Sequence, residues 1–429
     1  MSKHILRALP ELVQAQVITE ETAGQIRGYY NRQPNASSNR LFIIFGILGS
    51  LLIGMGIILI LAHNWDTLPK SIKLSIGLLP LLAGQVLSGY LLFKKSSSKA
   101  WIEGSATFLF FAVAVSIAIV SQVYNIEGNV GSFVLAWMVL TLPIVYVMRS
   151  SVAALLFVCG ITWYACETGY FSYPRDSAPT YWGLLLLMAP FYYFEFIQKK
   201  LKNNFFYFHC WAVALSLTIC LGLFAVDADE LLMIAYLGLF CIYIMLGEMK
   251  TFHTHKVLGN AFLVVGSLGT ISLLLTLSFR FYWEELPKYV EKSIIGTQEF
   301  LVALVITMLA TGLLIMNLRS RRFIDINSKS LAFIFMILLF VLGINMPVLS
   351  QVLTNVVILL FAIHTIRSGA KQDHLGILNY GLLIIAVLII CRFVDTNFSF
   401  VVRGLLFISV GVGFFAANYY LVKKRKGQA

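Results

Sequence analysis

The chain has 429 residues, of which 59% are hydrophobic and only 12% are charged, and its mean hydropathy is +0.84. Soluble domains carry about 25% charged residues, so this chain has too little polar surface to cover a water-soluble globule. The composition therefore argues against a soluble enzyme or binding domain. It predicts a polytopic membrane protein, in which lipid replaces water around most of the surface.

The net charge of +12 does not indicate nucleic-acid binding. The basic residues lie between apolar runs, and they are not interleaved with aromatic residues as in a nucleic-acid groove. The six cysteines fall in or beside apolar runs, and none has Cys-x-x-Cys spacing. We therefore predict that they are apolar packing residues and do not form a zinc site or a disulfide framework.

Residues 1–40 differ from the rest of the chain because they mix charged and apolar residues. Apolar residues recur at helical spacing in the first half of this segment. Thr19 can cap a second helix, whose first turn holds Glu20 and Glu21. The pattern predicts a small cytoplasmic helical hairpin with a linker. Residues 1–33 either dock a protein partner, self-associate, or rest on the membrane bundle.

From residue 41 onward the chain alternates apolar runs with short turns. A crossing needs ~20 apolar residues, and this rule predicts about 14 transmembrane helices in a bundle over 41–422, before a basic tail at 423–429. The predicted spans are 41–62, 72–93, 101–123, 132–148, 152–171, 181–198, 205–225, 231–248, 257–278, 299–317, 330–345, 348–366, 375–392 and 399–422.

The positions of the 32 Lys and Arg residues predict the orientation. Most of them fall in alternate loops, and this set of loops includes both termini. The positive-inside rule assigns such loops to the cytoplasm. Of the loops on the other side, 279–298 is the long one, and its apolar residues share a helical face. We predict a helix there that anchors in the outer interface or covers a site.

Polar and ionisable residues at membrane depth are costly, so they are functional candidates by default. On the predicted extracytoplasmic side they lie near the ends of the first, third, fifth and last two spans. The candidate substrate-binding residues are Asn64, Trp65, Asp66, Gln122, Tyr124, Arg392, Asp395 and Arg403.

Arg403 lies about one turn inside the last predicted span, where a guanidinium needs an acidic partner, a carbonyl or water. Asp66 and Asp395 are the expected partners because both are predicted at the same depth. One interpretation is an outward-facing polar pocket whose arginines bind an anion. The other is a set of interhelical ion pairs that lock the ends of the bundle. Gln351 and Asn355 lie inside predicted spans and are interpreted as bridges between helices.

The sequence contains no catalytic motif, no metal-ligand spacing and no phosphate-binding glycine loop. We therefore predict no catalytic residue, no bound metal and no cofactor.

Two motifs resemble a known family. Residues 62–69 (AHNWDTLP) follow the first predicted span, and residues 121–128 (SQVYNIEG) close the third. Together with the N-terminal hairpin they resemble domain-of-unknown-function family 2157, whose members are predicted bacterial multi-span membrane proteins. The resemblance covers residues 1 to about 150. The segments 392–395 (RFVD) and 403–407 (RGLLF) resemble the C-terminal part of long members. The resemblance implies the bacterial inner (plasma) membrane, and it supplies no established activity.

The leading hypothesis is an all-α integral membrane protein that transports or binds a small anionic or lipid-linked solute at an extracytoplasmic site. Arg392 and Arg403 would hold the anion, and Asp66 and Asp395 would set their geometry. One alternative is an enzyme acting on a lipid-linked substrate, with Asp66 as base or metal ligand. Another is a non-catalytic scaffold or envelope-stress component working through the hairpin. The prediction leans against an enzyme, names membrane lipid as a partner and excludes nucleic acid.

Overall fold

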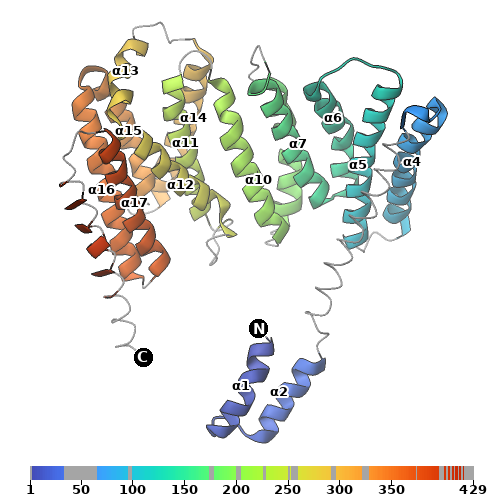
Figure 1. The fold of residues 1–429 in the computed structure, drawn as a ribbon, viewed down its shortest axis with the longest axis horizontal. Helices are drawn as coiled ribbons and strands as arrows, with labels where there is room; N and C mark the ends of the chain where they lie inside the picture. Colours follow the sequence, from blue (N-terminus) through green and yellow to red (C-terminus); the bar gives the residue numbers. More distant parts are fainter. Residues whose placement is uncertain are drawn as a thin grey trace. The chain divides into compact units, whose positions relative to one another are not determined.

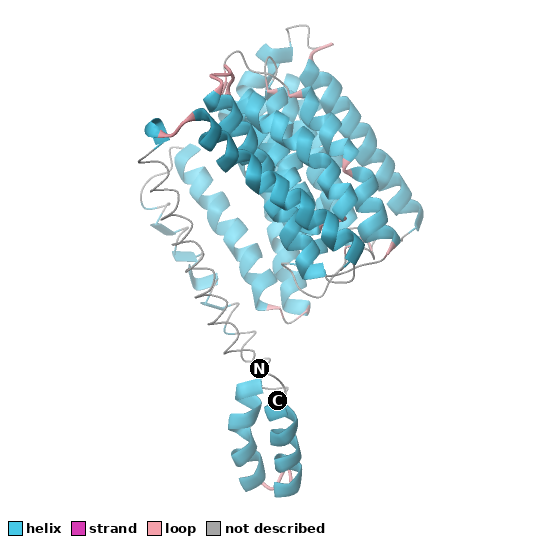
Figure 2. Ribbon diagram, turned by 90° about the vertical axis from the view of Figure 1, so that its right-hand side faces the viewer, coloured by secondary structure: helices cyan, strands magenta, loops and turns pink. Residues whose placement is uncertain are grey.

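The structure is a computed structural model. It describes residues 2–32, 65–94, 99–172, 178–199, 204–225, 229–249, 252, 259–290, 296–320, 328–372, 374–395 and scattered positions between 401 and 419. In this part of the chain the regular structure is helical throughout, as Figures 1 and 2 show. The predicted all-α class is therefore confirmed. The chain divides into two compact units, Met1–Ile76 and Gly77–Ala429.

The first unit begins with two helices, α1 (Ser2–Gln14) and α2 (Glu20–Arg32), which pack against each other. Leu9 and Ala23 are buried. The hydroxyl of Thr19 accepts a hydrogen bond from the backbone N–H of Thr22 at 3.3 Å, so Thr19 caps α2. The linker predicted up to residue 40 lies outside the described residues, as does the basic tail at 423–429.

The remaining helices run from residue 65 to residue 395. They are η1 (Trp65–Thr67), α4 (Lys70–Lys94), α5 (Lys99–Val123), α6 (Val130–Met148), α7 (Ser151–Gly169), α8 (Pro179–Leu187), α9 (Ala189–Tyr192), η2 (Tyr193–Gln198), α10 (Asn204–Leu221), η3 (Gly222–Phe224), α11 (Asp229–Glu248), α12 (Ala261–Thr276), α13 (Arg280–Val290), α14 (Gln298–Ser320), α15 (Ser328–Asn345), α16 (Pro347–Lys371) and α17 (Leu375–Asp395).

Among the described residues, nine helices are long and apolar enough to cross a membrane, or up to ten if the bent pair α12–α13 is one span. The chain is thus an integral multi-pass membrane protein, but the predicted 14 spans are not supported. Three of the predicted spans, 41–62, 257–278 and 399–422, lie wholly or partly outside the described residues. The run 181–198 is divided among α8, α9 and the π-helix η2. The helix α12 has 16 residues before a 76° bend.

The break in the run 181–198 has a physical cause. A rule of ~20 apolar residues per crossing treats every apolar run as one straight helix. Pro190 lies in the first turn of α9 and has no backbone N–H to continue the helix before it. Mean hydropathy does not detect such a break in a helix, because the interrupted run is as apolar as a continuous one.

The outer surface of the bundle is strongly apolar. On α4 alone, Leu79, Val86 and Phe93 are exposed by 62%, 72% and 90%. Soluble monomers rarely expose contiguous apolar surface of this kind. This surface contacts membrane lipid.

A glutamate on a neighbouring helix caps the N-terminus of α7. The Glu103 carboxylate, on α5, accepts hydrogen bonds from the backbone N–H groups of Ser151 at 3.0 Å and Val152 at 2.9 Å. It also accepts one from the Ser150 hydroxyl. The first N–H groups of a helix have no partner within the helix, and this end carries partial positive charge. Glu103 thus stabilises the start of α7.

Replacing Glu103 with alanine is expected to lower the free energy of unfolding by about 1–2 kcal/mol, because α7 loses an anionic cap. Thermal unfolding of the purified protein in detergent measures the effect. Glu127→Ala is the matched control, since Glu127 is an exposed acid between α5 and α6. Equal melting temperatures for the two variants would contradict a capping role.

Candidate functional site

A network of polar contacts in the second unit surrounds the break between α12 and α13. The chain bends by 76° here, and Ser278, in the break, is fully buried. Trp283 fixes the geometry, because its indole N–H donates to the carbonyl of Leu277 at 2.7 Å. The Trp283 ring is also fully buried, and its centre lies 5.6 Å from that of Phe340 on α15. The bend is therefore held by packing as well as by a hydrogen bond.

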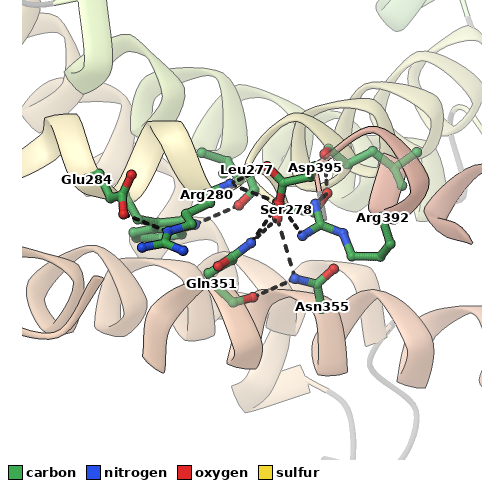
Figure 3. A network of polar contacts seen from close by, with 10 residues as sticks. Leu277, Ser278, Arg280, Glu284, Gln351, Asn355, Arg392 and Asp395 are labelled. Carbon is green, nitrogen blue, oxygen red and sulfur yellow. Dashed lines mark hydrogen bonds and ion pairs between the residues drawn. The ribbon is translucent and has the colours of Figure 1, made fainter. Parts of the chain in front are cut away.

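Asp395, at the end of α17, lies at the centre of this arrangement (Figure 3). Its Oδ2 accepts from Arg392 Nη1 at 2.6 Å and from Gln351 Nε2 at 2.9 Å. Both carboxylate oxygens lie 3.3 Å from the backbone nitrogen of Arg280, the first residue of α13. The carboxylate is thus surrounded by a guanidinium, an amide and a helix N-terminus.

Ser278 connects the same side chains to the break. Its carbonyl accepts from Gln351 Nε2 and Asn355 Nδ2, both at 3.4 Å, and its hydroxyl oxygen lies 3.1 Å from Arg392 Nη2. The Oδ1 of Asn355 is buried and has no hydrogen-bond partner among the residues that the structure describes. We call Ser278, Arg280, Gln351, Asn355, Arg392 and Asp395 the Asp395 network.

The charges of this network are paired and mostly shielded from solvent. The side chains of Arg392 and Asp395 are 18% and 11% exposed. The Arg392 guanidinium also lies 5.5 Å from the centre of the Phe279 ring, within cation–π range. The nearby pair of Arg280 and Glu284, 2.6 Å apart, is 60% and 45% exposed. The pair of Arg392 and Asp395 is therefore mostly buried within the bundle, and the pair of Arg280 and Glu284 lies on its surface.

This geometry is that of an anion site. Helix N-termini bind anions through their unpaired N–H groups, and a guanidinium adds a strong charge-assisted bond. In the Asp395 network the bound anion is a carboxylate of the chain itself. An external anion would find the same donors if Asp395 moved aside.

Two of the predicted site residues, Arg392 and Asp395, lie together in this network. Gln122 and Tyr124 lie at the end of α5, and both are exposed. The helix α5 packs on α6 and α7, whereas α17 packs on α12 and α16. Figure 1 shows α5 and α17 on opposite sides of the bundle, with α7 and α10 between them. The structure does not bring these two groups together.

The other predicted site residues belong to different parts of the chain. In the first unit, Trp65 and Asp66 lie in η1, where Asp66 is exposed and the Lys73 ammonium lies 5.3 Å from the centre of the Trp65 ring. Asn64 and Arg403 lie outside the described residues, so the predicted pairing of Arg403 with an aspartate stays a prediction.

Four members of the network were not among the predicted site residues. Ser278 and Arg280 were not singled out, and Gln351 and Asn355 were interpreted as bridges between helices. Gln351 and Asn355 do bridge helices, because both donate to the carbonyl of Ser278 in the break, and Gln351 also donates to Asp395. Their spacing of four residues placed both on one face of α16 and could have indicated a shared partner. Among the described residues, no three His, Cys, Asp or Glu side chains gather as metal ligands would.

Residues 10–154 match the family model described as "Predicted membrane protein (DUF2157)". This part of the chain belongs to the DUF2157 family. The resemblance expected from the sequence motifs is thereby confirmed. No curated protein and no solved structure matches the chain.

The DUF2157 region contains only part of the predicted site. Trp65, Asp66, Gln122 and Tyr124 fall within the matched residues, and the Asp395 network lies entirely beyond them. The family match therefore describes the first third of the chain, whereas the network is built by its second half.

Proposed function

We propose that this multi-pass membrane protein transports or binds a small anionic or lipid-linked solute at the Asp395 network. The position of the Asp395 carboxylate is the observation that supports the proposal most strongly. It lies at the N-terminus of a broken helix, beside a guanidinium and an amide. Transporters hold anionic substrate groups with discontinuous helices in the same way, because the N-terminus of a half-helix carries partial positive charge.

In this proposal the solute exchanges with Asp395. An incoming anion takes the donors of Arg392, Gln351 and the α13 N-terminus, and Asp395 turns away. A change of side-chain rotamer would move the Asp395 carboxylate without a change in the backbone of α17. The internal carboxylate keeps Arg392 neutralised while no solute is bound, which avoids an unpaired charge in a mostly buried position.

Asn355 narrows the chemistry of the solute. A buried acceptor without a partner costs about 1–3 kcal/mol, and Asn355 Oδ1 is such an atom. A solute that carries a hydroxyl or an amine next to its anionic group would donate to it. The proposal therefore favours a small anion with a hydrogen-bond donor.

We further propose that the protein resides in a bacterial inner membrane with both termini in the cytoplasm, so that the network faces outward. The distribution of basic residues supports this orientation. Asn64, Trp65, Asp66 and Arg403 are also proposed to bind solute, as the sequence predicts. Gln122 and Tyr124 stay proposed solute-binding residues that are separate from the Asp395 network, because α5 packs on α6 and α7 and α17 packs on α12 and α16.

The test uses the full-length protein and two arginine variants. Arg392→Gln removes the guanidinium of the network. Arg280→Gln removes an exposed guanidinium nearby and keeps the backbone N–H through which Arg280 belongs to the network. Untargeted mass spectrometry then identifies the small molecules that co-purify with each protein. We expect an anionic solute on the wild-type protein and on Arg280→Gln, and at least a tenfold loss with Arg392→Gln, because truncating one partner of a buried charge pair costs about 2–5 kcal/mol.

Identical solute profiles for the three proteins would overturn the proposal. That result would favour the scaffold alternative, in which residues 1–33 bind a protein partner or a second copy of the chain. Val17 in this segment is 66% exposed, which leaves an apolar contact available. Size-exclusion chromatography of a chain lacking residues 1–33 would show whether a complex is lost. If a solute is found, its counterflow into proteoliposomes separates transport from binding.

A further inference from the structure

A cavity of about 280 Å³ lies where α6 ends beside α9 and η2, and no residue of the Asp395 network lines it. Tyr146 and Arg149 line it from the end of α6, and Phe191, Phe194 and Glu195 line it from the other side, followed by Lys199. Its volume is near the lower limit for small-molecule sites, which is about 300 Å³. A polar group about the size of a lipid headgroup would fit this volume.

One wall of the cavity is aromatic and reaches the outside of the bundle. Phe191 is buried, and its ring meets that of Tyr146 edge to face at 6.3 Å. The Tyr146 hydroxyl donates to the carbonyl of Leu187, which fixes this ring. Phe194 is 53% exposed. A wall that is buried at one end and exposed to lipid at the other suits a ligand that has both a polar and an apolar part.

The opposite wall comes from a π-helix. In η2 the hydrogen bonds run from i to i+5, so each turn is wider than in an α-helix. Such turns occur frequently at functional sites. Here the widened turn supplies Phe194, Glu195 and Gln198 to the same cavity, with Lys199 directly after it.

The charges around the cavity leave a surplus positive charge. Lys199 Nζ lies 2.5 Å from Glu195 Oε2, so these two side chains neutralise each other. Arg149 is exposed, and within the described residues no acid pairs with it. Its backbone is left-handed, with φ of 47°, a conformation that non-glycine residues adopt infrequently. This backbone conformation ends α6 and places Arg149 at the rim.

We propose that this cavity binds the phosphate of an anionic phospholipid headgroup. Arg149 supplies a planar fork that matches phosphate geometry, and the aromatic wall faces the acyl chains. Basic pockets between transmembrane helices bind anionic headgroups in this way. Because Glu195 cancels one of the two cations, the charge fits a lipid with a single negative charge. The Glu195 carboxylate accepts from a hydroxyl of the headgroup, as phosphatidylglycerol would offer.

Native mass spectrometry of the full-length protein in neutral detergent tests this with phosphatidylglycerol as the probe. Arg149→Gln is compared with Arg367→Gln, which removes an exposed arginine from α16. We expect Arg149→Gln to weaken phosphatidylglycerol binding about fivefold, and Arg367→Gln to leave it unchanged, since a basic residue near a membrane surface contributes about that factor. Equal binding by these two variants would overturn the proposal.

A second variant keeps the test valid if Arg149→Gln folds poorly. Glu195→Gln removes the one negative charge and releases Lys199, so phosphatidylglycerol binding is expected to strengthen about fivefold. Unchanged or weaker binding would contradict the assignment. Inorganic phosphate separates the two sources of the anion: we expect it not to displace phosphatidylglycerol, and displacement at comparable concentration would identify a free-phosphate site. Phosphatidylcholine, the zwitterionic reference, is expected to bind more weakly than phosphatidylglycerol, because its choline group carries a positive charge and offers no hydroxyl to Glu195.

Discussion

Replacing Asp395 with alanine is expected to lower the free energy of unfolding by about 3–5 kcal/mol, because it removes one partner of a mostly buried ion pair. The Arg392 guanidinium loses the carboxylate 2.6 Å away, and the N-terminus of α13 loses the anion that caps it. The bend at Ser278 would loosen as a result. Temperature-dependent size-exclusion chromatography of the full-length protein in detergent measures the loss.

The exposed pair in the same region is the matched control. Glu284→Ala breaks the pair between Arg280 and Glu284, which is largely exposed, so we expect a change below about 1 kcal/mol. A double variant, Arg392→Met with Asp395→Leu, is expected to recover most of the stability lost in Asp395→Ala, because no charge is left unpaired. Equal losses from Asp395→Ala and Glu284→Ala would show that the network is not what holds the bend.

The same variant also examines the proposed exchange of anions. Removing the Asp395 side chain leaves the donors of Arg392, Gln351 and the α13 N-terminus in place. Acetate, added at constant ionic strength, is expected to restore part of the stability of Asp395→Ala through binding to the folded state. It should leave Glu284→Ala unchanged. An absence of rescue would indicate that the donors do not form an anion site by themselves.

The membrane class of the fold could be predicted from the sequence, and the path of the helices only in part. The runs predicted at 101–123 and 375–392 became α5 and α17, whose ends differ by three residues at most. A segment that crosses lipid must be helical and apolar, so a membrane span can be recognised from its composition. The breaks at Met188 and Ser278 depend instead on Pro190 and on the packing of Trp283. Hydropathy carries no information about either.

The candidate site could also be predicted only in part. Arg392 and Asp395 are three residues apart on one helix, so their pairing follows from helical spacing. The contribution of Ser278 required tertiary structure, because it lies more than 100 residues earlier in the chain. The charge rule places residues at one depth in the membrane, but it does not give their positions around the bundle. For this reason Gln122 and Tyr124 are predicted on the same side of the membrane as Asp395, although the helix that carries them does not pack where Asp395 lies.

Close packing of α11 against α12 gives the second large expected effect. A Cβ atom at Gly266 would lie 2.8 Å from the carbonyl oxygen of Phe240 and 3.0 Å from the backbone nitrogen of Ile244. Both are backbone atoms of α11, so no rotamer change relieves the clash. Helices in a membrane associate through such close contacts, since lipid offers no hydrophobic force to drive them together. Gly266→Ala is therefore expected to cost about 1–3 kcal/mol, and Gly266→Leu more.

Gly312 provides the opposite expectation on α14. It is exposed, and a Cβ built there meets no atom within 4 Å. Alanine at this position should stabilise the protein by about 0.4–1 kcal/mol, because it reduces the freedom of the unfolded chain and favours the helix. The two Gly→Ala variants thus have effects of opposite sign on the melting temperature. If Gly266→Ala were as well tolerated as Gly312→Ala, α11 and α12 would have to lie further apart, and the bundle that positions the α12–α13 break would need a different packing.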